Sequence, residues 1–131
     1  KELRSAKALL SYAATCGMIE LQMVKYMAAH GIDQIRVRRG KEFVDKPIEK
    51  ATMGEIVGFL RPNNGQDLYA VFDVFKNQIT IDELGDFVDI RNEIIHESLV
   101  ACFGKRINPE KINIRNLKII YKIAECLKIY N

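Results

Sequence analysis

Apolar residues recur every three to four positions along most of this chain, which is the spacing of an amphipathic helix. A segment with this pattern can bury one face against its neighbours. We expect helices from Glu2 to His30, Thr52 to Leu60, Gln66 to Asn77 and Thr80 to Gly104, and a last one that begins at Asn108. A chain of 131 residues is long enough to form one core. The sequence therefore predicts a single all-α domain over residues 1–131, an up-and-down bundle of four to five helices.

Signals at the helix ends support these boundaries. Thr52 and Thr80 are each followed three residues later by a glutamate, Glu55 and Glu83, which is the capping-box pattern of a helix start. Pro109 suits the first turn of the last helix. Residues 32–51 lack the helical pattern, and a small hairpin and an irregular loop are both compatible with their alternation of apolar and basic positions.

Composition narrows the class of protein only a little. The chain is 48% hydrophobic and 28% charged, with a net charge of +3, which is compatible with a polyanionic partner but does not indicate one. No apolar run approaches the ~18 residues of a membrane span, so we expect no membrane segment. We expect Cys16, Cys102 and Cys126 to be buried free thiols, which favours a reducing, cytoplasmic location. Their spacing does not suit zinc, and we expect neither a metal nor a cofactor.

Two charged residues interrupt apolar faces. Arg91 projects from the middle of an apolar stripe that consists of Leu84, Phe87, Val88, Ile94, Ile95, Leu99 and Cys102. Glu20 projects from the centre of the apolar face of the first helix. A charge directed into a core is costly unless a partner or a wet cleft receives it. Glu20 and Arg91 are therefore expected to meet, either as a buried salt bridge that fixes helix register or with Glu20 orienting Arg91 at the floor of a cleft.

Asn92 and His96 stand one helical turn apart next to Arg91. The run from Arg91 to His96 resembles the R-N-x-x-x-H motif of HEPN domains (higher eukaryotes and prokaryotes nucleotide-binding), and the likeness is specific from Leu84 to Leu99. The order of long and short helices resembles the layout of that family. The resemblance implies a metal-independent endoribonuclease, a toxin or anti-phage defence effector, whose composite active site forms in a homodimer. It also suggests an antitoxin protein as a partner.

The residue types suit RNA cleavage by attack of the 2′-hydroxyl on the adjacent phosphate. The His96 imidazole would take the proton near neutral pH, and the forked Arg91 guanidinium would hold oxygens of the phosphorane. Asn92 would position the phosphate or the imidazole. One histidine cannot act as base and acid at the same instant, and a two-fold dimer supplies a second one. We expect products with a 2′,3′-cyclic phosphate and a 5′-hydroxyl.

One position departs from a subgroup of the family. HEPN toxins that are modified by a nucleotidyltransferase antitoxin carry a tyrosine two residues after the histidine, where this chain has Ser98. The sequence therefore does not indicate that class of antitoxin, although a serine hydroxyl is also a group that can be modified.

Arg36, Arg38, Arg39 and Lys41 form a basic cluster that suits contact with an RNA backbone; a solvated loop is the alternative. No aromatic residue alternates with these four, so we predict no base specificity. Two other functions stay open for the chain. It could be a non-catalytic HEPN-like helical module that binds a nucleotide, RNA or protein partner, or a structural dimerisation domain in which the Glu20–Arg91 pair serves register alone.

Overall fold

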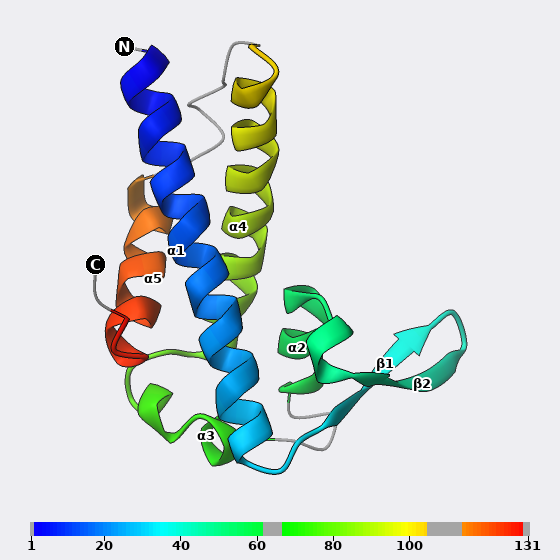
Figure 1. The fold of residues 1–131 in the computed structure, drawn as a ribbon. Coiled ribbons are helices and arrows are strands. Elements are labelled where there is room, and N and C mark those ends of the chain that lie inside the picture. Colours follow the sequence, from blue (N-terminus) through cyan, green and yellow to red (C-terminus); the bar gives the residue numbers. More distant parts are fainter. Residues whose placement is uncertain (1, 62–66, 105–113, 130–131) are drawn as a thin grey trace. The chain divides into compact units, whose positions relative to one another are not determined.

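The computed structural model describes residues 2–61, 67–104 and 114–129. These residues are mostly helical and include one two-stranded antiparallel sheet (Figure 1). The prediction of a mostly helical protein is confirmed. The prediction that the chain is purely α-helical is wrong, because residues 34–47 form a β-hairpin. The chain divides into two compact units, Lys1–Ile19 with Asp86–Asn131 and Glu20–Gly85. A single domain over residues 1–131 stays a prediction.

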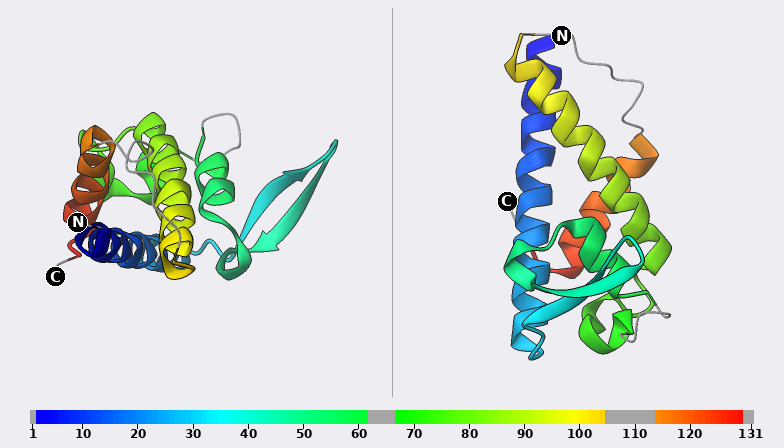
Figure 2. Two further views of the ribbon diagram at one scale, coloured as in Figure 1. Left: turned by 90° about the horizontal axis from the view of Figure 1, so that it is seen from above. Right: turned by 90° about the vertical axis from the view of Figure 1, so that its right-hand side faces the viewer.

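The first unit contains three helical segments, which Figures 1 and 2 show side by side. They are the N-terminal part of α1 (Glu2–Ala29), α4 (Ile81–Cys102) from Asp86 onward, and α5 (Ile114–Cys126). Tyr12 on α1 meets Tyr121 on α5 edge to face, with ring centroids 5.9 Å apart, and the Tyr121 hydroxyl donates to that of Tyr12 over 3.1 Å. The predicted helix start at Asn108 and Pro109 lies outside the described residues.

The buried face of α4 is rotated from the predicted one. Within the first unit its buried positions are Phe87, Ile90, Ile94, Glu97 and Ser98. The expectation that Leu99 and Cys102 face inward is wrong, because Leu99 is 55% exposed and Cys102 is exposed. The spacing of three to four residues centres the buried stripe near Ile94 rather than on Arg91. Arg91 is therefore half-buried at the edge of the stripe.

The second unit begins with the end of α1 and the hairpin. Helix α1 ends at Ala29, one residue before the predicted His30, and Gly31 follows with φ +83°, a backbone conformation that glycine adopts easily just after a helix. Strands β1 (Gln34–Arg39) and β2 (Glu42–Pro47) pair antiparallel around a two-residue turn, in which Gly40 has φ +64°. Of the two interpretations left open for residues 32–51, the hairpin is the one that forms. A short 3₁₀ helix, η1 (Ile48–Lys50), follows.

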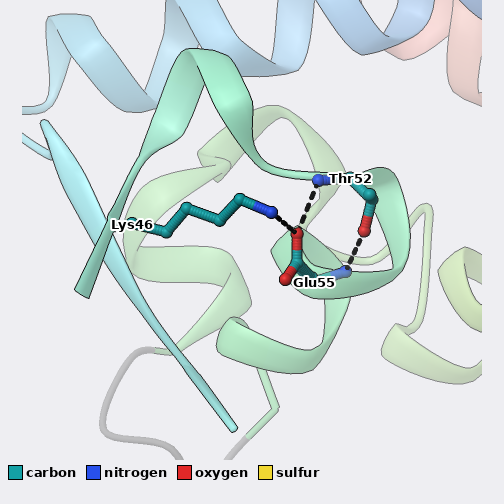
Figure 3. A network of polar contacts seen from close by, with 3 residues as sticks. All are labelled: Lys46, Thr52 and Glu55. Atoms are coloured by element: carbon teal, nitrogen blue, oxygen red, sulfur yellow. Dashed lines mark hydrogen bonds and ion pairs between the residues drawn. The ribbon is translucent and has the colours of Figure 1, made fainter. Parts of the chain in front are cut away.

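Helix α2 (Met53–Phe59) packs against β1. Its predicted capping box is present: the Thr52 hydroxyl accepts from the Glu55 N–H over 3.2 Å, and Glu55 Oε1 accepts from the Thr52 N–H over 2.9 Å. The ammonium of Lys46 on β2 reaches the same oxygen at 2.8 Å (Figure 3). Thr80 and Glu83 form a second capping box at the start of α4. Both helix starts are thus confirmed.

The predicted helix from Gln66 to Asn77 is wrong over its described part, which begins at Asp67, although Leu68, Val71, Phe72 and Phe75 are buried. Within the described residues, α3 (Leu68–Val71) stops at Phe72 and a 3₁₀ helix, η3 (Asp73–Phe75), follows. The chain bends at Phe72, where φ is −115° and ψ is 74°, and the Phe72 and Phe75 rings stack with centroids 5.1 Å apart. The Tyr69 hydroxyl donates to the Ile79 carbonyl over 2.9 Å. This hydrogen bond links α3 to the residues that follow η3.

The cysteines only partly match expectation. None of the three, which all belong to the described residues, forms a disulfide. Cys16 is buried, as predicted, whereas Cys126 is half-buried and Cys102 is exposed near the end of α4. Among the helices that the structure describes, none combines the length and apolar character needed to cross a membrane.

Candidate active site

Helix α4 carries the three predicted catalytic residues within the first unit. Arg91 Nη1 donates to Asn92 Oδ1 over 3.0 Å, so these neighbours are held together, with Arg91 half-buried and Asn92 exposed. Asn92 and His96, four residues apart, project within about 40° of each other around the helix axis, whereas Arg91 and His96 diverge by about 140°. One helix therefore presents Asn92 and His96 on one exposed side and Arg91 beside them.

The imidazole of His96 lies between solvent and a buried acid. Its side chain is 61% exposed, and its Nδ1 lies 3.5 Å from Oε1 of Glu97, whose side chain is 3% exposed. A carboxylate at this distance from Nδ1 orients the ring so that Nε2 is the nitrogen directed away from Glu97.

Glu97 is a candidate site residue that the sequence analysis missed. The signal was present, since Glu97 follows Ile94 by three residues and Ile90 by seven and so falls on the stripe that is buried. The sequence analysis centred the apolar stripe on Arg91 and therefore did not place Glu97 on the buried face of the helix. A buried carboxylate next to an exposed imidazole is a stronger indication of a site than the histidine alone.

Glu93, His96 and Glu97 bring three potential metal ligands together. One ligand atom from each lies within 4.8 Å of the other two, a group that could hold a divalent cation. Among the described residues, buried Glu93 Oε2 accepts no hydrogen bond. The expectation of no metal rested on finding no clustered ligands at short spacing and overlooked this group, which the sequence encodes as glutamate, histidine and glutamate at positions i, i+3 and i+4 of one helix.

Ser98 is an unsuitable acceptor for modification in this fold. It is 7% exposed, and within the described part of the chain its buried Oγ has no hydrogen-bond partner. An enzyme could reach this hydroxyl only after α4 had moved away from its neighbours.

The predicted supporting residue, Glu20, is half-buried on α1. It belongs to the second unit, while Arg91 belongs to the first. The expected meeting of Glu20 with Arg91 therefore stays a prediction, as do both roles considered for the pair.

The basic cluster lies on the hairpin of the second unit, and Arg36, Arg38, Arg39 and Lys41 are all exposed. Arg36 Nε lies 3.7 Å from Asp45 Oδ1, and Arg38 Nε donates to the Gly40 carbonyl over 3.0 Å. Phe43 is 58% exposed and stands directly opposite Arg38 in the strand register. The sequence analysis looked for aromatic residues along one strand and missed this ring, which the hairpin brings next to the arginines.

No protein-family model matches this chain, and the comparisons with curated proteins and with solved structures found no match either. Its function is therefore inferred from its own residues.

Proposed function

We propose that this protein is a metal-independent endoribonuclease with a HEPN-like fold, active in the cytoplasm as a homodimer. The observation that carries the proposal is the exposed His96 imidazole beside the buried Glu97 carboxylate, on the same helix as the Arg91–Asn92 pair. This combination supplies a proton acceptor, a group that stabilises its charged form, and a cation for the phosphate.

The reaction uses the RNA's own 2′-hydroxyl as nucleophile. His96 Nε2 removes the hydroxyl proton while the oxygen attacks the adjacent phosphorus. Arg91 stabilises the negative charge that builds on the non-bridging oxygens. The 5′-oxygen leaves with a proton from a second imidazole, which yields a 2′,3′-cyclic phosphate and a 5′-hydroxyl. This route assigns no step to a metal ion.

A homodimer formed through α4 fits the exposed side of that helix. Asn92, His96, Leu99 and Phe103 succeed one another at intervals of four, three and four residues, which is the spacing of one helix face. Leu99 is 55% exposed and Phe103 is 78% exposed, and large exposed apolar side chains next to polar residues are typical of an interface. Pairing this face about a two-fold axis places two imidazoles near each other, and brings Arg91 of one copy toward His96 of the other.

The toxin or anti-phage role and an antitoxin partner are part of the proposal and come from the motif resemblance alone. The RNA would also contact the basic hairpin, where Arg36, Arg38, Arg39 and Lys41 are exposed.

An RNA cleavage assay in EDTA tests the proposed function. We expect the wild-type chain to cut single-stranded RNA, and His96→Ala to lower the rate at least about a hundredfold, the usual contribution of a general acid–base. The matched control is His30→Ala, which removes the chain's other histidine from an exposed position just after α1. Equal cutting by wild type and by both the His96→Ala and Arg91→Ala variants would overturn the proposal.

A further inference from the structure

A cavity in the second unit has the lining of a nucleotide site. It measures about 470 Å³ and lies between the hairpin and α2, with walls that include Arg36, Arg38, Phe43, Gly54, Gly58 and Phe59. Its volume falls in the range of small-molecule sites, about 300–1,000 Å³. Two arginines and two phenylalanines contribute to this lining, which brings residue types that bind phosphate next to aromatic residues on which a base can stack.

The electrostatics of the cavity favour an anion. Glu55 also lines it, but its carboxylate accepts hydrogen bonds from Lys46 Nζ at 2.8 Å and from the Thr52 N–H at 2.9 Å. These bonds offset its charge and hold it in place (Figure 3). The Arg36–Asp45 pair is 3.7 Å long between side chains that are 68% and 58% exposed, and such surface pairs are weak. A phosphate can therefore displace Asp45 from Arg36.

Arg38 and Phe43 supply the specific geometry. They face each other across the two strands, so their side chains lie on the same side of the hairpin. Among the described residues, the Arg38 guanidinium makes its hydrogen bond through Nε, to the Gly40 carbonyl, and its two amino groups remain for a phosphate. The exposed Phe43 ring offers an adjacent apolar surface, which a stacked base would cover.

Helix α2 leaves room for the ligand at Gly58. This glycine lines the cavity, and a Cβ built on it meets no atom within 4 Å. A side chain at this position would therefore start without a clash at its Cβ and would occupy part of the cavity. Gly58→Ala should also favour the helix, because alanine has the higher helix propensity.

We propose that this cavity binds one nucleotide, with its phosphate on Arg36 and Arg38 and its base against Phe43 and Phe59. The nucleotide is either free or part of a single-stranded RNA, since both present the same base and phosphate. The choice of RNA as a ligand rests on the proposed function, whereas the cavity and its lining do not.

Binding of a fluorescent 2′-O-methyl RNA octamer to the full chain tests this inference. That RNA lacks the attacking hydroxyl, so binding is measured whether or not the protein is a nuclease. We expect Gly58→Leu to weaken binding about tenfold or more, the equivalent of one lost base stack. Gly17→Leu is the matched control, because Gly17 is an exposed helical glycine whose Cβ also meets nothing within 4 Å. Gly58→Ala, with circular dichroism on all variants, covers the case in which the leucine variant fails to fold.

Competition with adenosine and uridine monophosphates distinguishes a free nucleotide from a nucleotide within an RNA strand as the ligand of the cavity. Displacement of the octamer by a mononucleotide assigns the cavity to free nucleotides, and absence of displacement assigns it to nucleotides within a strand. Arg38→Gln should also reduce the salt dependence of octamer binding by about one unit of log–log slope. Binding that is unchanged in folded Gly58→Leu and Gly58→Ala proteins, or absent from the wild type for every probe, would overturn the inference.

Discussion

At the scale of single residues, Glu97 should determine how well His96 works. Its carboxylate lies 3.5 Å from Nδ1 of His96 and is 3% exposed, so it can hold the ring and stabilise its charged form without competing for substrate. We predict that Glu97→Gln lowers kcat for RNA cleavage about tenfold or more, since the proton transfer loses its charged partner. The KM for RNA should change less than about twofold.

Steady-state cleavage kinetics, with circular dichroism to establish folding, measure this effect. Glu93→Gln is the comparison on the same helix, because Glu93 belongs to the same cluster, whereas the carboxylate that lies 3.5 Å from His96 Nδ1 is that of Glu97. A change in KM alone, or an equal loss of kcat in both variants, would contradict a positioning role for Glu97.

The sequence predicts Arg91, Asn92 and His96 as site residues from residue type, spacing and the motif resemblance, and their catalytic roles stay a prediction. Their surroundings could be predicted only in part. The burial of Glu97 follows from helical spacing once Ile90 and Ile94 are taken as the centre of the stripe. The sequence does not reveal which of several overlapping apolar stripes is buried, because that depends on which segments pack against α4.

At the scale of elements, the start of α2 depends on the charge of Glu55. The hydrogen bond from Lys46, followed by that from the Thr52 N–H, lowers the pKa of this carboxyl below its usual value of about 4.5. A folded-state pKa below the unfolded one means that the charged carboxylate stabilises the fold above about pH 4.5, and that this contribution is lost as the pH falls through the folded-state pKa.

We predict that Glu55→Gln destabilises the protein by roughly 1 kcal/mol at pH 7, the usual size of a cap and a partly exposed ion pair. The difference from wild type should shrink as the pH is lowered below about 4.5 and through the lower, folded-state pKa of Glu55. Urea unfolding at a series of pH values measures it. Glu49→Gln, an exposed carboxylate on the preceding 3₁₀ turn, should have little effect, and a Glu55→Gln difference that grows with acid would contradict the prediction.

Elements with local signals were predictable, and those decided by distant contacts were not. Capping boxes at Thr52 and Thr80, and the glycine stop at Gly31, encode helix ends within a few residues. The hairpin remained one of two alternatives, because strand pairing depends on a partner that the local pattern does not specify. The bend at Phe72 was missed since the packing of its ring, rather than helix propensity, decides the backbone there.

At the scale of the whole molecule, the proposed dimer requires that the exposed apolar side chains near the end of α4 form the interface. We predict that Leu99→Glu together with Phe103→Glu converts a dimer to a monomer and abolishes RNA cleavage. Leu99 on α4 and Phe103 just after its end are exposed, and charges at these positions would have to be buried in the dimer without partners. Analytical ultracentrifugation and the cleavage assay measure the two effects together.

The matched control is Leu10→Glu on α1, where a leucine is 50% exposed outside the predicted interface. It should leave both the dimer and the cleavage rate unchanged. A wild-type chain that is monomeric and still cuts RNA, or a double variant that stays dimeric and fully active, would argue against a composite site.

Whole-molecule features were the least accessible to prediction. A mostly helical chain followed from periodicity, whereas the HEPN-like arrangement, the meeting of Glu20 with Arg91 and the homodimer remain predictions. All three depend on contacts between segments far apart in sequence or between chains. Helical periodicity and capping signals report local conformation and do not determine such contacts.

The ends of the RNA products test the proposed chemistry most directly. The protein is incubated in EDTA with a defined RNA strand and with the same strand carrying one 2′-deoxynucleotide at the cut position. Attack by the 2′-hydroxyl predicts a 2′,3′-cyclic phosphate on one fragment and a 5′-hydroxyl on the other, with the deoxy-substituted strand left intact at that position. Fragments with 3′-hydroxyl and 5′-phosphate ends, or cutting at the deoxynucleotide, would contradict a mechanism built on His96 and Arg91.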